Sequence, residues 1–153
     1  MDVADKIIEL LMHCENLKGG FSVNQLTHCL QTATLAEQDG ADDELIVASL
    51  CHDIGKVISR ANHGGIIAAI FKPYVREEVY MVLKMHQIFE GKHYFGYMDK
   101  DPNQYLQFKE EPWYDLALKF MEWDQASFDP NFQTLPLSYF IPKIRKIFVY
   151  DTK

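Results

Sequence analysis

A histidine and an aspartate stand side by side, as His52 and Asp53, inside the otherwise apolar stretch 45–58. Burying adjacent ionisable groups without partners costs several kcal/mol, so an apolar segment does not normally carry them. If the stretch is helical, His52, Asp53 and Lys56 lie on one side, because residues four apart stack on a helix. Gly55 leaves room there for another backbone or a ligand. The pair alone is equally compatible with a core histidine beside a helix-surface acid, so the rest of the chain has to decide.

Apolar residues recur at helical spacing along most of the chain, and no stretch shows a clear strand pattern. Residues 91–107 break the pattern: 93–97 are expected to form a loop, and Asp101-Pro102 to open a short helical turn. We expect Asp2 and Asn62 to cap helices, and Gly19-Gly20 to stop the first. The sequence predicts an all-α bundle, one domain over 1–153, with helices at about 2–17, 24–37, 42–57, 62–71, 76–89, 112–125 and 137–148.

Composition restricts the possible partners. With 48% hydrophobic and 13% aromatic residues the chain should fold. A net charge of −7 argues against a general nucleic-acid or membrane surface, while it leaves room for a local cationic pocket that binds an anionic small molecule. No apolar run approaches the ~18 residues of a membrane helix, and the N-terminus lacks a signal-peptide pattern. Cys14, Cys29 and Cys51 form no CxxC and indicate buried, reduced thiols of a cytoplasmic protein.

Six ionisable side chains fall on apolar faces of five predicted helices: His28, His52, Asp53, His63, His86 and Asp124. Imidazoles and carboxylates together suit divalent metals such as iron, manganese, zinc or cobalt. Six exceed what one catalytic metal takes, because such a metal keeps a position open. They suffice for two metals if one carboxylate bridges, and Asp53 is the candidate because it adjoins His52. The absence of a cysteine ligand argues against a structural zinc site.

Most of these residues have an ordinary alternative when each is taken alone. His28 is equally typical of a helix surface, and Asp124 can pair with a lysine. His63 can be a simple first-turn residue, but a cation at a helix N-terminus is unfavourable, which favours a neutral, metal-binding imidazole. His93 lacks a helical context, so we assign it, with Tyr94, to substrate binding. The prediction of a metal site therefore depends on the whole set.

Taken in order, His28, His52-Asp53 and Asp124 resemble the H…HD…D signature of the HD-domain superfamily. The added His63 and His86 resemble the extra histidines of its dinuclear branch, which contains myo-inositol oxygenase and the HD-domain phosphonate oxygenases. The stretches 23–28, 52–56 and 123–130 strengthen the resemblance, which covers about residues 23–148. It implies an HD-domain helical bundle.

The resemblance also implies two irons bridged by Asp53, one held further by His28, His52 and Asp124 and the other by His63 and His86. Members of the branch use a mixed-valent Fe(II)/Fe(III) pair, in which one iron binds the substrate's hydroxyl and the other activates O2. Cleavage of a carbon–hydrogen bond is followed by cleavage of a carbon–carbon or carbon–phosphorus bond.

Lys56 matches the substrate-contacting lysine of the inositol enzyme, so we assign catalytic roles to Lys56 and Asp53 and substrate binding to Lys56. Beside two irons, a lysine pairs with a phosphonate, a carboxylate or an alkoxide. The alternative is that HDxGK also occurs in HD proteins without oxygenase activity.

The chain departs from the phosphonate oxygenases before the first histidine, where they carry a lid with a tyrosine and a glutamate. No tyrosine precedes His28, and the connector reads Lys18-Gly19-Gly20-Phe21. His93, Tyr94 and Tyr97 are candidates for a different lid.

The leading hypothesis is a diiron oxygenase acting on a small hydroxylated molecule, anionic or polyhydroxylated, with phosphonates among the candidates. The alternative is a phosphohydrolase using manganese, cobalt or zinc, in which a metal-bound water attacks a nucleotide or phosphate ester. The Gly-Tyr-Pro signature of the cyclic-dinucleotide branch is missing, because residues 95–98 read Phe-Gly-Tyr-Met. A third hypothesis, a non-catalytic HD domain, is disfavoured by the complete ligand set.

Overall fold

The computed structural model describes residues 1–18 and 21–149, and this part of the chain contains helices and turns but no strand. The predicted all-α fold is confirmed. The predicted helix stop at Gly19-Gly20 lies outside the described residues. The α-helices are α1 (Val3–His13), α2 (Gln25–Gln38), α3 (Asp43–Cys51), α4 (His63–Phe71), α5 (Glu77–Tyr94), α6 (Tyr114–Gln125) and α7 (Leu137–Ile147), and the short 3-10 helices are η1 (Cys14–Asn16), η2 (Ile54–Val57), η3 (Phe95–Met98) and η4 (Gln104–Phe108).

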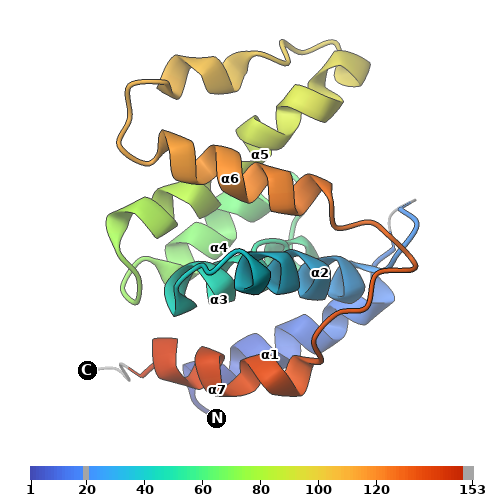
Figure 1. Ribbon diagram of the computed structural model, residues 1–153, viewed down its shortest axis with the longest axis vertical. Coiled ribbons are helices and arrows are strands. Elements are labelled where there is room, and N and C mark those ends of the chain that lie inside the picture. Colours follow the sequence, from blue (N-terminus) through green and yellow to red (C-terminus); the bar gives the residue numbers. More distant parts are fainter. Residues whose placement is uncertain (19–20, 150–153) are drawn as a thin grey trace.

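The helices stack in successive levels (Figure 1). α1 and α7 lie together at one end of the molecule, although they come from opposite ends of the chain. α2 and α3 pack above them, and α5 contacts both α4 and α6 on the far side. The core between these levels contains fully buried aromatic rings, among them Phe71, Phe89, Phe120 and Phe140.

Helix starts follow the predicted capping residues where a short polar side chain is available. Asp2 and Asp5 form a reciprocal capping box, as expected. The side chains of Asn24 and Asp42 accept hydrogen bonds from the backbone of α2 and α3, at 2.8 and 3.0 Å. Asn62 stands before the first residue of α4 as predicted, but its side chain makes no capping hydrogen bond.

The third helix is shorter than predicted: α3 ends at Cys51, not at residue 57. Asp53 leaves the helical conformation with φ −105° and ψ 1°, and η2 follows. His52, Asp53 and Lys56 therefore do not share one α-helix face, although they still face one region. The sequence pattern missed this end because residues 45–51 are buried on every side, so no apolar stripe marks where the helix stops.

The fifth helix is longer than predicted, since α5 continues to Tyr94 rather than ending at Phe89. His93 and Tyr94 are therefore helical, and the predicted loop at 93–97 is wrong. Gly91 suggested an end, but the ring of Phe95 packs where a Cβ of Gly91 would stand. Asp101 does not open a helix either: its side chain accepts from the backbone of Asn103 in a turn, before η4.

The cysteines match the expectation of buried thiols: Cys14, Cys29 and Cys51 are free and buried. Burial, reinforced by the nearby charge of Asp53, raises the pKa of Cys14 to about 12, so its thiol remains protonated.

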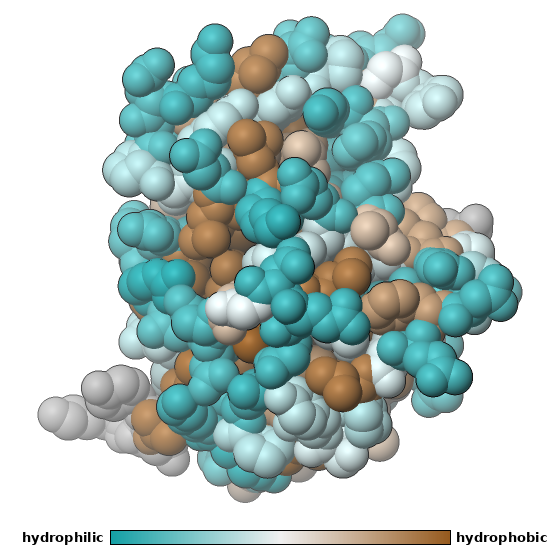
Figure 2. Space-filling model, in the orientation of Figure 1, coloured by the Kyte–Doolittle hydropathy of each residue, from teal (hydrophilic) through white to brown (hydrophobic). Residues whose placement is uncertain are grey.

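Figure 2 shows one face of the molecule as mostly hydrophilic, with hydrophobic side chains gathered in patches. Among the described helices, none combines the length and the apolar character needed to cross a membrane.

Candidate metal centre

The fold brings six side chains from five segments to one buried place, although they span 97 positions of the sequence from residue 28 to 124. Each of the six is at most 9% exposed. They are His28 in the first turn of α2, His52 and Asp53 after α3, His63 at the start of α4, His86 in α5 and Asp124 at the end of α6. These are the six residues that the sequence singled out as candidate ligands.

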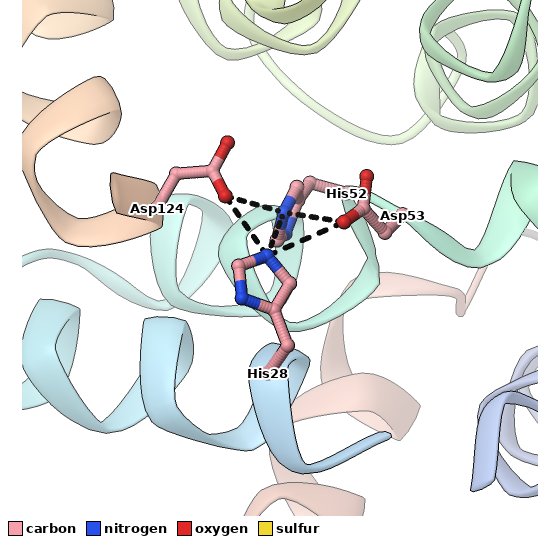
Figure 3. Close-up of side chains that lie close together, drawn as sticks. All are labelled: His28, His52, Asp53 and Asp124. Atoms are coloured by element: carbon pink, nitrogen blue, oxygen red, sulfur yellow. Dashed lines mark hydrogen bonds and ion pairs between the residues drawn. The ribbon is translucent and has the colours of Figure 1, made fainter. Parts of the chain in front are cut away.

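One group contains His28, His52, Asp53 and Asp124, whose side chains point toward a common centre (Figure 3). Asp124 Oδ1 lies 2.9 Å from Nε2 of His28 and 3.2 Å from Nε2 of His52. The two imidazole nitrogens are themselves 3.1 Å apart. Four donor atoms converging at such distances fit one cation between them.

A second group contains Asp53, His63 and His86. Asp53 Oδ1 lies 3.2 Å from Nε2 of His63 and 3.5 Å from Nε2 of His86. Its other oxygen, Oδ2, lies 3.3 Å from His28 and 3.2 Å from His52. Asp53 therefore belongs to both groups through different oxygens, which is the arrangement of a bridging carboxylate.

All four imidazoles are oriented in the same way. The Nδ1 atoms of His28, His52, His63 and His86 lie 2.7–2.8 Å from the backbone carbonyls of Ser127, Ser49, Arg60 and Leu83, respectively. Because a carbonyl only accepts, each Nδ1 carries the hydrogen, so each ring in its neutral form presents an Nε2 lone pair to the centre. This backbone support fixes ring orientation in metal-binding histidines.

The imidazole nitrogens and carboxylate oxygens that converge here are electron-pair donors, and a bound cation would stabilise them. The buried Nε2 of His86 has no hydrogen-bond partner among the described residues, and burial lowers the pKa of this imidazole. Burial also opposes protonation of His28 and His52, but Asp53 and Asp124 outweigh it and raise the pKa of both rings. The same buried carboxylates are kept ionised, with the pKa of each well below its usual range, by these histidines. Imidazoles, carboxylates and an orphaned buried nitrogen together fit divalent metal ions.

Stacked aromatic rings and a pair of hydrogen bonds support the first group on the side away from its common centre. Phe128 stacks on His28 with ring centres 4.2 Å apart, and Phe21 stacks on Phe128 at 4.7 Å. Gln31 of α2 both donates to and accepts from the backbone of Asp129, at 2.6 and 3.1 Å. These contacts hold the segment after α6 against α2, so that the carbonyl of Ser127 reaches His28.

A cavity of about 890 Å³ opens onto the centre, and Asp53, His28, His63, His86 and Asp124 contribute to its wall. This volume suits a small-molecule ligand. The sequence-predicted substrate residues divide: Lys56 and Tyr94 line the cavity, whereas His93 is absent from the described lining. Lys56 Nζ lies 3.3 Å from Asp53 Oδ2 and 5.9 Å from the ring centre of Phe21. Tyr97, a candidate lid residue, is 91% exposed.

Glu90 is a cavity residue that the sequence reasoning missed. Its Oε1 is buried without a hydrogen-bond partner among the described residues. Burial, followed by the negative charge of Asp124, raises the pKa of Glu90 to about 10, so the carboxyl is neutral near pH 7. Its spacing could have revealed it, because Glu90 follows His86 by four residues and so lies on the same face of α5.

In a comparison with protein families, residues 26–124 match the family described as HD domain. The matched region runs from α2 to α6 and contains all six converging residues. No curated protein matches the chain.

Proposed function

This chain belongs to the HD domain family, and we propose that it is a metal-dependent enzyme holding two metal ions. The observation that carries the proposal is the position of Asp53, whose two oxygens face two different sets of histidines. A single metal would need only the group around His28, His52 and Asp124. The second group would then bury His63 and His86 against Asp53 without a purpose, and a second cation explains it.

The reaction that we propose is oxidative cleavage of a small hydroxylated substrate, with phosphonates among the candidates. A mixed-valent Fe(II)/Fe(III) pair would supply activation of O2 and cleavage of a carbon–hydrogen bond. Support comes from the all-nitrogen-and-oxygen donor set of both groups, which suits iron, and from the resemblance to the dinuclear oxygenases. The six side chains are each at most 9% exposed, so water reaches the centre chiefly through the cavity.

Specific side chains of this chain have roles in that reaction. Lys56 lines the cavity beside Asp53 and would bind an anionic or alkoxide oxygen of the substrate. Asp53 holds both halves of the centre together. Tyr94 presents its hydroxyl near Oε1 of Gln125, at 3.4 Å, and would contact substrate from α5. The assignment of His93 to substrate binding stays a prediction, and it would require contact from outside the described cavity wall.

The second candidate is a phosphohydrolase acting on a nucleotide or phosphate ester, with manganese, cobalt or zinc. The observation in its favour is the pairing of Lys56 with a dinuclear donor set, because a cation beside two metals also stabilises a phosphoryl group. Both candidates use the same ligands, so metal identity and chemistry have to separate them.

The deciding measurement is metal content combined with EPR on protein purified without chelator and then partially oxidised in air. About two irons per chain, with the low-field signal of a coupled Fe(II)/Fe(III) pair, would support the oxygenase. Hydroxyphosphonates and polyols would then be screened for O2 uptake. Manganese, zinc or cobalt without a mixed-valent signal would rule out the oxygenase and direct the screen to phosphate esters.

A further inference from the structure

The cavity continues past the metal centre along α5, which presents two neighbouring rows of side chains to it. One row beside the centre consists of His86, Glu90 and Tyr94, at four-residue steps. The adjacent row begins with Lys84 and continues through Ile88 and Gly91, at steps of four and three, and Phe95 at the start of η3 extends it. The ligand space therefore has a part that the six converging residues do not form.

The loop before α4 is fastened to this second part of the wall. Gln87 of α5 accepts from the backbone of Gly64 at 2.8 Å and donates to the carbonyl of Ala61 at 3.2 Å. The carbonyl of Arg60 accepts from Nδ1 of His63 at 2.8 Å. Since Gln87 follows Lys84 by about one helical turn and Ala61 follows Arg60 directly, these bonds hold the segment that carries Arg60 against the part of α5 that carries Lys84, and both residues line the cavity.

Arg60 and Lys84 differ from Lys56 in whether they form an ion pair. Lys56 pairs with Asp53 at the metal centre, whereas Arg60, Lys84 and a further lining residue, Lys100, form no ion pair with any residue that the structure describes. Lys84 Nζ lies 5.8 Å from the ring centre of Tyr80, which supplies no negative charge to neutralise it. Other basic residues, such as Arg76 and Lys143, do pair with carboxylates. In a chain of net charge −7, cations that form no ion pair within the described residues create a local positive field at this cavity, and that field attracts an anion.

We propose that Arg60 and Lys84 form a second subsite, which binds an anionic group of the substrate remote from the reacting end. The substrate class is thus a small molecule with two functional ends: one that reacts at the metal centre, and a phosphate, phosphonate or carboxylate that Arg60 and Lys84 hold. The cavity of about 890 Å³ accommodates such a molecule. This inference rests on the proposed function, because it takes the metal centre as the reacting end.

The test compares the binding of two probes that contain neither a phosphate ester nor a hydroxylated carbon, so neither of the two proposed reactions can convert them. Methylphosphonate carries one anionic group, and propane-1,3-bisphosphonate carries two. Binding of each to the purified protein is measured by isothermal titration calorimetry, for wild type and for Arg60→Gln/Lys84→Gln. Lys92→Gln is the matched control, because Lys92 is an exposed cation of the same helix whose ammonium lies over a tyrosine ring, as that of Lys84 does, but Lys92 does not line the cavity.

We expect the double variant to bind the bisphosphonate about tenfold more weakly, while its affinity for methylphosphonate changes less than twofold. Lys92→Gln should bind both probes as wild type does. An equal loss for both probes, no loss for either, the same loss in Lys92→Gln, or no binding of the bisphosphonate to wild type would overturn the subsite.

Metal content and melting temperature of each variant, measured alongside, separate this result from the proposed function. Both substituted side chains lie outside the six converging residues, so metal content should not change. If the wild-type protein holds no metal, the dinuclear function fails. The subsite is then still judged by whether bisphosphonate binding depends on Arg60 and Lys84.

Discussion

Asp53 Oδ1 lies 3.2 Å from Nε2 of His63, while the other oxygen of the same carboxylate faces His28 and His52. This relationship links α4 to the segment after α3 through one side chain. It depends on the early end of α3, because the turn at Asp53 and η2 brings the carboxylate between the two sets of histidines. Because Asp53 is shared by the two groups and the histidines are not, mutations can distinguish the loss of both groups from the loss of one.

Substitution of Asp53 should affect both halves, whereas substitution of His86 should affect one. We expect Asp53→Ala to lower metal content from about two per chain to below one, and His86→Ala to leave about one. Inductively coupled plasma mass spectrometry on freshly purified protein measures this directly. His93→Ala is the control on the same helix and should retain the wild-type content. Equal losses in His86→Ala and His93→Ala would contradict the assignment.

Gly55 should be required for the position of His63. A Cβ at residue 55 would stand 2.6 Å from the carbonyl oxygen and 3.0 Å from Cα of His63. Because backbone atoms cannot move aside cheaply, Gly55→Ala should cost about 1–3 kcal/mol of unfolding free energy and reduce occupancy of the His63–His86 group. Chemical denaturation and metal analysis test both effects. In Gly65→Ala no atom lies within 4 Å of the new Cβ, so neither should fall.

The sequence predicted which six side chains converge better than it predicted the backbone that carries them. That they bind metal stays a prediction. The six residues could be found because ionisable groups are rare in apolar segments, although His52 and Asp53 lie in a stretch that is buried all round and shows no periodic stripe. The bridging position of Asp53 was inferred from its neighbour His52, and the geometry agrees with it. The end of α3 could not be found, because a helix buried all round has no periodic stripe to interrupt.

The residues of the cavity wall were harder to predict than the six converging residues of the candidate metal centre. Glu90, Arg60 and Lys84 belong to it through the packing of α5 against the loop before α4, which no local pattern encodes. His93 was assigned to substrate binding because residues 93–97 were expected to form a loop, which left it without a helical context. α5 instead continues through it, since Phe95 packs over Gly91 and allows the helix to pass a residue that usually weakens one.

Lys56 should matter for turnover and not for metal binding. It contacts Asp53 Oδ2 at 3.3 Å and lines the cavity, so Lys56→Ala removes a cation from substrate without removing a ligand. We expect unchanged metal content and a fall of about tenfold or more in kcat/KM for the substrate found in the O2-uptake or hydrolysis screen. Lys72→Ala, at an exposed position over Tyr80, should behave as wild type. Unchanged turnover in Lys56→Ala would remove its proposed role.

Metal removal should destabilise the fold, because the metal centre joins five segments of the chain. Without the metal, the Nε2 lone pairs and the carboxylate oxygens of the centre face one another with no cation between them. A bound metal at a hundred times its dissociation constant contributes about 2.7 kcal/mol. We therefore expect chelation to lower the melting temperature, and readdition of the native metal to restore it. The same chelator should have little effect on Asp53→Ala, which distinguishes metal removal from a direct effect of the chelator on the protein.

The ion pairs between α3 and α7 should give a pH-dependent contribution that is independent of the metal centre. Asp43 contacts Nζ of Lys143 at 2.9 Å and Nζ of Lys146 at 2.7 Å. Hydrogen bonds from Lys143 and then Lys146 hold the pKa of Asp43 below its usual 3.8. The side chains of Asp43 and Lys143 are 27% and 23% exposed and that of Lys146 is 69% exposed, so solvent reaches the pairs and screening limits the loss in Asp43→Asn to about 1 kcal/mol or less at pH 7.

The sign of the pH dependence follows from the lowered pKa. Above pH 3.8 the carboxylate is ionised in both the folded and the unfolded chain, and its contribution is fully present. As the pH falls through 3.8 and then through the lower folded value, the unfolded chain gains the proton first and the contribution disappears. Urea denaturation should therefore show Asp43→Asn less stable than wild type at pH 7, with the difference closing below pH 3.8. Asp115→Asn, at an exposed residue without an ion pair in the described chain, should show a smaller difference at pH 7. A difference for Asp43→Asn that stayed constant down to pH 3 would mean that the loss comes from helix packing and not from the charge.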